Sequence, residues 1–188
     1  MKKTLLLLII LSSSLLCNAQ FVKKRAINAQ IGYGLSIPYE SVDDTADSGF
    51  FLQGEYVLTI KSWFELKPYV GLILTNPKGE DLNGNPTDEF AITKAGLLGG
   101  KFRLRAPIPW VAPYIETGFG LSIGKFETQT AFISKNKSGL QYHIPVAFGL
   151  ELGKETNVDI GFTYYIQPQV EQVVGAFALG ITIPLKDK

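Results

Sequence analysis

The chain has 188 residues, and its 18 Lys and Arg against 17 Asp and Glu give a formal net charge of +1. This length favours a single domain, and the near-neutral charge argues against nucleic acid as a partner, because nucleic-acid binding depends on a strongly basic surface. Charged residues make up only 19% of the chain, beside 19 glycines and 12% aromatic residues. Beyond the N-terminal segment, no window resembles the apolar helix of about 20 residues that spans a bilayer. The chain is therefore either a soluble protein with a large core or a membrane β-barrel.

The N-terminal segment has the organisation of a secretory signal. Two lysines precede an apolar run at 5–11, and a small-residue cleavage site ends at Ala19. We therefore expect a cleaved signal peptide over 1–19 and a mature domain over 20–188. Cys17 would leave with the signal peptide, so that the mature domain would have no disulfide and no thiol chemistry. A lipid-anchored Cys17 is the alternative, disfavoured because the leucine before it is too large for the usual lipoprotein pattern.

The clearest structural pattern lies at 113–125, where apolar and small or polar residues alternate strictly. A period of two marks a strand, because successive side chains leave a pleated backbone on opposite sides. About ten such residues are enough for a tilted strand to cross a bilayer. The two faces are Ile115, Thr117, Phe119, Leu121 and Ile123 against Glu116, Gly118, Gly120, Ser122 and Gly124.

The same alternation recurs along the whole mature chain. It predicts strands, in chain order, at 26–37, 50–60, 64–75, 90–105, 113–125, 141–152, from 158 onwards and at 173–185. No helical pattern separates them. Connections of this length suit antiparallel neighbours, because a parallel crossover needs about a dozen residues or more and usually a helix.

The connections between the strands alternate in length. Polar segments rich in turn-forming residues lie at 38–48, 76–89 and 127–139, and the intervening connections are mostly short, such as the Pro-marked turn at 106–112. Bacterial outer-membrane barrels have this asymmetry, with short periplasmic turns and longer outer loops. The fold predicted is all-β, an eight-stranded antiparallel up-and-down transmembrane β-barrel.

The aromatic residues favour the same fold, because they gather where two interfacial girdles would lie. Those near the short turns are Trp63, Phe64, Trp110 and Tyr114, and those near the long loops are Tyr39, Phe50, Phe90 and Tyr142.

A soluble barrel of the lipocalin kind is the alternative fold, with its apolar face turned inward. So many bulky side chains would overfill an eight-stranded interior, and the other face carries few of the Lys and Glu that a water-facing wall normally has. We therefore expect the apolar face to contact lipid, including Ile115, Phe119, Leu121, Phe148 and Leu150.

Two strand starts carry a family resemblance. KPYVGL at 67–72 and APYIETGFGLSIG at 112–124, together with the signal peptide, resemble small outer-membrane barrels of the OmpX and OmpA-barrel kind, over about 26–185. The resemblance implies the barrel fold and a location in the outer membrane, but these patterns of Tyr, Gly and alternation say little about activity. Such barrels often end on an aromatic residue that their assembly machinery recognises, whereas this sequence ends on Lys188. No wall-anchoring domain is expected after the barrel.

The sequence offers little chemistry. His143 is the only histidine, so a multi-histidine metal site is not expected within one chain. Ser122 and His143 could meet in the lumen from neighbouring strands, as in a hydrolase. The outer-membrane lipid A deacylases, however, use a His-x-Ser pattern on the lipid side, and here Pro145 stands in the serine position and the alternation turns His143 inward. A hydrogen-bonded luminal histidine is the favoured reading.

The acidic run Asp43, Asp44 and Asp47 could bind calcium, but it lacks the spacing and glycine of a calcium loop, so solvated loop acids are expected. No catalytic, cofactor-binding or metal-ligating residue and no cofactor are predicted.

The lumen is predicted to be closed by ion pairs across its strands. The turn at 106–112 places Arg103 opposite Glu116 on the inner face, with Arg105 opposite Tyr114 and Lys101 opposite Gly118. In the next hairpin Glu151 meets Asp159, and two facing acids repel unless a cation is shared between them. We expect one of the luminal cations on the fourth strand to supply it.

Three function classes follow. The first is a non-enzymatic outer-membrane protein that acts structurally or binds an extracellular or envelope protein through loops 38–48, 76–89 and 127–139, because loops on a rigid scaffold often carry function. The second is a narrow passive channel, and the third is a lipid-modifying enzyme. The first is favoured because side chains fill an eight-stranded interior. Outer-membrane lipids are the other expected partners, and nucleic acid is not one.

Overall fold

The computed structural model describes residues 22–155 and 157–185. The predicted signal peptide at 1–19 and its cleavage site lie outside the described residues. The strands are β1 (Lys24–Pro38), β2 (Asp47–Lys61), β3 (Phe64–Asn76), β4 (Phe90–Arg105), β5 (Trp110–Gln129), β6 (Ser134–Gly153), β7 (Val158–Gln167) and β8 (Gln172–Leu185).

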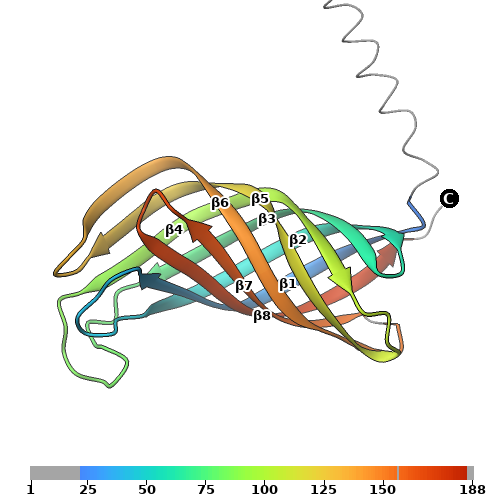
Figure 1. Cartoon of the computed structure of the whole chain (residues 1–188), viewed down its shortest axis with the longest axis horizontal. Helices are drawn as coiled ribbons and strands as arrows, with labels where there is room; N and C mark the ends of the chain where they lie inside the picture. Colours follow the sequence, from blue (N-terminus) through green and yellow to red (C-terminus); the bar gives the residue numbers. More distant parts are fainter. Residues whose placement is uncertain (1–21, 156, 186–188) are drawn as a thin grey trace, which may run out of the picture.

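Each strand pairs antiparallel with the next, and β1 pairs with β8 to close the barrel. Figure 1 shows the longer connections at one end of the barrel and the short turns, with the end of β8, at the other. Closure leaves no strand edge unpaired, which a bilayer without water to satisfy the backbone requires. Within the described residues, no helix is long and apolar enough to cross a membrane. The predicted eight-stranded up-and-down barrel is confirmed.

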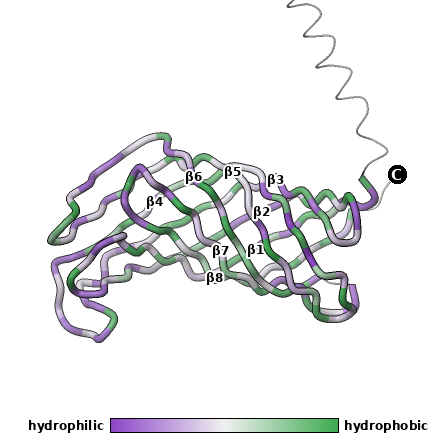
Figure 2. The backbone as a smooth tube through the Cα atoms, viewed as in Figure 1, coloured by the Kyte–Doolittle hydropathy of each residue, from purple (hydrophilic) through white to green (hydrophobic). Residues whose placement is uncertain are grey.

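The alternation divides the wall into an apolar outside and a mostly polar inside. Ile115 and Phe148 are 55% and 56% exposed on the outer face, whereas Glu116 and Ser122, on the other parity of β5, are 2% and 0% exposed. Hydrophobic segments recur along the strands in Figure 2. Large apolar side chains therefore point outward, as predicted, and small or polar ones fill the interior.

The position predicted for the connection after the fifth strand is wrong. Residues 127–139 were expected to form a polar loop, but β5 and β6 continue as a paired hairpin up to Gln129 and Ser134, leaving a turn at 130–133. The expectation failed because this part of the hairpin stands clear of the apolar belt. Its outward positions, such as Glu127 and Asn136, are polar, so the apolar half of the alternation is lost although the ladder continues.

The aromatic residues follow the predicted girdles with one exception. Trp63 and Trp110 are exposed near the short turns, and Tyr39 and Phe50 near the long loops. Tyr114 was assigned to the girdle by its position near a turn, but it is only 7% exposed and lies inside the barrel. The alternation of β5 decides its direction, because it shares the parity of the inward-facing acid two residues further on.

Candidate functional site

The lower half of the lumen, toward the short turns, is filled by ion pairs centred on Arg103. Its Nε lies 2.6 Å from Oε1 of Glu116, and its Nη1 lies 2.9 Å from Oδ1 of Asp159 and also contacts Glu151. The predicted hairpin registers, Arg103 opposite Glu116 and Glu151 opposite Asp159, are confirmed. The predicted cation shared between Glu151 and Asp159 is confirmed as well, and it is Arg103. The Arg103 guanidinium also stacks 3.6 Å from the ring centroid of Tyr114, which gives the inward-facing ring a cationic partner.

Two lysines extend this cluster across the barrel. Lys67 Nζ lies 2.5 Å from Glu55 and 3.1 Å from Glu116, and Lys101 Nζ lies 2.5 and 2.6 Å from the same two carboxylates. Glu55 and Lys67 are members for which the sequence predicted no partner. The sequence does place an acid on the inner face of β2, but a contact across the lumen cannot be predicted from the register of a single hairpin. The result is a buried network in which each of these charges touches an opposite one.

Above the ion pairs lies an apolar and aromatic layer. Phe51, Ile73, Leu97, Tyr165 and Val174 are between 0% and 2% exposed and belong to one buried cluster. The Tyr165 hydroxyl donates to Oε1 of Gln53 at 2.6 Å, so the polar tip of this ring is satisfied as well. Side chains of this size fill the cross-section of an eight-stranded barrel.

His143 lies within this layer and is fully buried. Its Nδ1 is 2.6 Å from Ser122 Oγ, and its Nε2 is 2.5 Å from the Tyr69 hydroxyl. Gln167 Nε2 donates to the same serine oxygen at 3.0 Å, a contact for which the sequence gave no indication. The structure thus brings the possible serine–histidine pair together, and it places both residues at 0% exposure. A nucleophile needs access to its substrate, so the geometry favours the hydrogen-bonded luminal histidine.

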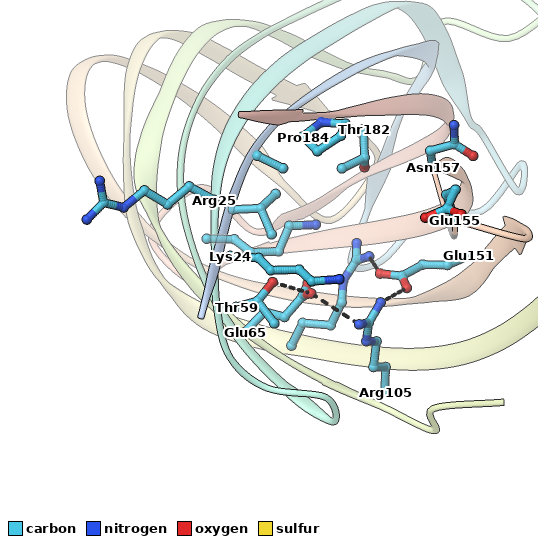
Figure 3. A pocket seen from close by; sticks show the side chains of 14 residues that line it. Lys24, Arg25, Thr59, Glu65, Arg105, Glu151, Glu155, Asn157, Thr182 and Pro184 are labelled. Atoms are coloured by element: carbon cyan, nitrogen blue, oxygen red, sulfur yellow. Dashed lines mark hydrogen bonds and ion pairs between the residues drawn. The ribbon is translucent and has the colours of Figure 1, made fainter. Parts of the chain in front are cut away.

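The short-turn end of the barrel holds a cavity of about 220 Å³ below the ion pairs. Its wall includes charged side chains from several strands and apolar ones such as Ala26, Val57 and Pro184. In Figure 3, Glu65, Arg105 and Glu151 lie close together with ion pairs drawn between them, while Arg25 points away. The cavity is the mouth of the lumen, and the network above it closes the way through.

At the opposite end, Glu89 ties the loops together. Its Oε2 accepts from the backbone N–H of Val42 at 3.0 Å and of Asp43 at 3.2 Å, and its Oε1 accepts from that of Ala131 at 2.8 Å. Burial acts against ionisation of Glu89, but these hydrogen bonds outweigh it and hold the pKa of the carboxyl below its ordinary value. One carboxylate thereby links the loop at 39–46, the loop at 77–89 and the turn at 130–133.

The acidic run of the first loop takes part in the same bonding. Asp47 was expected to be a solvated loop acid, which is wrong: it is 1% exposed and accepts from the backbone N–H of Lys78 at 2.8 Å and of Ala91 at 2.7 Å. Asp43 accepts from the Thr87 hydroxyl at 2.7 Å. Only Asp44 matches the expectation of an exposed loop acid. In the described part of the chain, no group of three or more His, Cys, Asp or Glu could hold a metal ion.

A closed antiparallel barrel with an apolar outer wall, a polar interior and short turns at one end defines an integral outer-membrane β-barrel. Its fold is that of the small barrels of the OmpX and OmpA-barrel kind. The long loops therefore face outward from the cell, and the short turns face the periplasm.

Comparisons with known proteins agree with this fold. No protein-family model and no curated protein sequence matches the chain. Among solved structures it is similar to Neisserial surface protein A, with a TM-score of 0.57 and 12% identity over 85% of this chain and 96% of that one. Ail, the attachment invasion locus protein of Yersinia pestis, has a TM-score of 0.49 and 16% identity, over 86% of this chain and 99% of that one. The outer membrane enzyme PagL has a TM-score of 0.44 and 16% identity, over 85% of this chain and 99% of that one. At such identities the similarity concerns the fold alone.

Proposed function

We propose that the protein is a non-catalytic outer-membrane barrel that binds a protein partner through its outer loops. The observation that carries the proposal is a hollow of about 440 Å³ between these loops, lined among others by Tyr39, Leu82 and Phe132, with Glu40 and Asp44 beside them. Leu82 and Phe132 are 69% and 66% exposed. Clustered exposed apolar side chains are typical of interaction sites.

The loops that form this hollow are held in place before any partner arrives. Glu89 and Asp47 accept backbone hydrogen bonds from separate loops, which fixes the loops relative to one another. A preorganised surface loses less conformational entropy on binding. The apolar hollow with acids at its edge fits a partner segment that presents a lysine or arginine next to apolar side chains, because the cation pairs with the acids while its stem covers the apolar wall.

Site-specific photo-crosslinking in intact cells tests the binding role. A photoreactive residue at Phe132 should yield a protein adduct of defined mass, and the same residue at Trp110, near the periplasmic turns, is the matched control. The adduct should disappear when Glu40→Lys and Asp44→Lys reverse the charge of the hollow. An adduct that survives this reversal, or no adduct from position 132, would overturn the proposal.

The channel alternative has its own measurement. Purified protein in a planar bilayer should give no stable current steps, since the ion pairs and the apolar layer occupy the lumen. A reproducible open level is therefore not expected, and any steady conductance of the wild-type protein would favour the channel.

A further inference from the structure

Two lysines stand directly opposite each other on the outside of the barrel. Lys94 on β4 pairs with Lys125 on β5, and both side chains are exposed on the outward face. Like charges directly opposite on neighbouring strands repel. Among the ion pairs of the described residues, none joins either lysine to a carboxylate. This part of the wall therefore carries two positive charges that the protein itself leaves uncompensated.

The pair lies at the outer edge of the apolar belt. On the membrane side of it, Leu98 and Ile123 are 56% and 61% exposed on the same face. On the loop side, the next outward pair is Glu127 of β5 and Ile92 of β4, so the outer face there is no longer uniformly apolar. Lysines at the boundary of the hydrocarbon region extend their heads to the level of the lipid headgroups. The charges of Lys94 and Lys125 are therefore at the depth at which lipid phosphates lie.

The wall directly below the pair has no side chain. Gly96 follows Lys94 on the outward face of β4, between Leu72 and Ile123 of the neighbouring strands. A Cβ at Gly96 would have its nearest neighbour, the backbone oxygen of Ile123, 3.9 Å away, which is an ordinary contact distance, so close packing of the strands does not require a glycine here. It forms a shallow apolar recess on the membrane side of the cations.

We propose that Lys94 and Lys125 bind the phosphate of an outer-leaflet lipid, with an acyl chain of the same lipid packed into the recess at Gly96. A phosphate between the two ammonium groups replaces their repulsion with attraction to both. Each basic residue near a membrane surface contributes about 1 kcal/mol to the binding of an anionic lipid, which is about fivefold in affinity. The recess selects a lipid over free phosphate. The proposal does not depend on the partner of the loops.

Native mass spectrometry of the mature protein in detergent tests this with diphosphoryl lipid A as the probe. Lys94→Gln and Lys125→Gln should each lower the affinity about fivefold. The matched control is Lys137→Gln, which removes the charge of an exposed lysine on the same hairpin but on the parity that faces the barrel mouth. It should leave binding unchanged. Folding of each variant is checked by its mobility in electrophoresis without heating.

Two further arms separate the headgroup from the chain. Fully dephosphorylated lipid A should bind weakly, and its affinity should be the same for the wild-type protein and for the double lysine variant. Gly96→Leu, which fills the recess and keeps both charges, should weaken lipid binding as well, whereas inorganic phosphate at the same concentration should not compete. Equal losses in Lys137→Gln, no loss in either lysine variant, or full competition by inorganic phosphate would each overturn the proposal.

Discussion

The two ends of the barrel interior are closed by different kinds of contact. Toward the periplasm, side chains pair with side chains: Arg103 and Lys101 meet Glu55, Glu116 and Asp159 across the lumen. Toward the outside, carboxylates accept from the backbone of loops, as Glu89 does from Val42 and Ala131. The first kind of contact locks strands that the barrel already holds in place. The second gives otherwise irregular segments a fixed shape.

This difference bears on function. A buried charge network makes the lower lumen a rigid plug, and breaking it would destabilise the whole barrel. The loop contacts lie near water, so their loss changes the shape of a surface more than the stability of the fold. The following measurements, from the largest expected effect to the smallest, test that contrast.

The largest effect is expected from breaking the plug. Arg103→Ala leaves Glu116, Glu151 and Asp159 without their central cation, and removing one partner of a buried pair costs about 3–5 kcal/mol in unfolding free energy. The loss of unfolding free energy is measured by urea unfolding in detergent micelles of Arg103→Ala, Glu116→Ala and the double variant. The double variant should cost less than the sum of the two single ones. Small, additive costs of about 0.2–1 kcal/mol would instead indicate a hydrated lumen.

A charge on the lipid face should have the next largest effect. Leu121→Arg places a cation within the apolar belt, which costs about 2–4 kcal/mol at mid-membrane depth. The matched control is Leu82→Arg at the tip of an outer loop, which should change the unfolding free energy by less than about 0.5 kcal/mol because the site is in water. A similar cost at both positions would contradict the assignment of the lipid face.

Removing the loop acceptor should have a smaller, local effect. Glu89→Ala takes the acceptor from three backbone N–H groups. A charged hydrogen-bond acceptor contributes about 1.5–3 kcal/mol, here to loop closure rather than to the barrel. Hydrogen exchange at Val42 and Ala131 should accelerate while exchange in β3 does not. Asp88→Ala, an exposed neighbour, is the control; unchanged exchange in Glu89→Ala would show that other contacts hold the loops.

The same carboxyl predicts how the loops respond to acid. Because the pKa of Glu89 is below its ordinary value in the folded protein, its contribution is complete above the ordinary carboxyl range and is lost as the pH falls through the lowered value. Exchange protection of Val42 and Ala131 should therefore fall at acid pH in the wild-type protein. In Glu89→Gln the exchange protection of these two residues should be lower than in the wild-type protein at neutral pH, and it should hardly change as the pH is lowered.

The smallest effect is expected at the rim. Lys135 and Glu171 form an ion pair of 3.3 Å, with side chains 41% and 40% exposed. An exposed pair contributes about 0.2–1 kcal/mol, and salt screens it. A double-mutant cycle with Lys135→Ala and Glu171→Ala should give a coupling energy in this range at low salt and close to zero at high salt. A coupling energy as large as that of Arg103 and Glu116 would remove the contrast between rim and plug.

Contacts within one hairpin could be read from the sequence. Arg103 opposite Glu116 and Glu151 opposite Asp159 follow from the alternation and from tight turns, which set the register locally. The same reading failed at 127–139, where polar residues on the outward positions conceal a strand outside the membrane. It also failed for Asp47, because an acid that accepts loop N–H groups looks in sequence like any solvated acid.

The sequence by itself determined the strands within the apolar belt, the lipid-facing side and the local registers, because a period of two and turn length act between residues close in the chain. Only the tertiary structure decided which inward side chains meet across the lumen. Glu55 with Lys101, Tyr69 with His143 and Glu89 with the outer loops are such contacts. They depend on barrel closure and on the tilt and stagger of the strands, which bring together positions far apart in the chain.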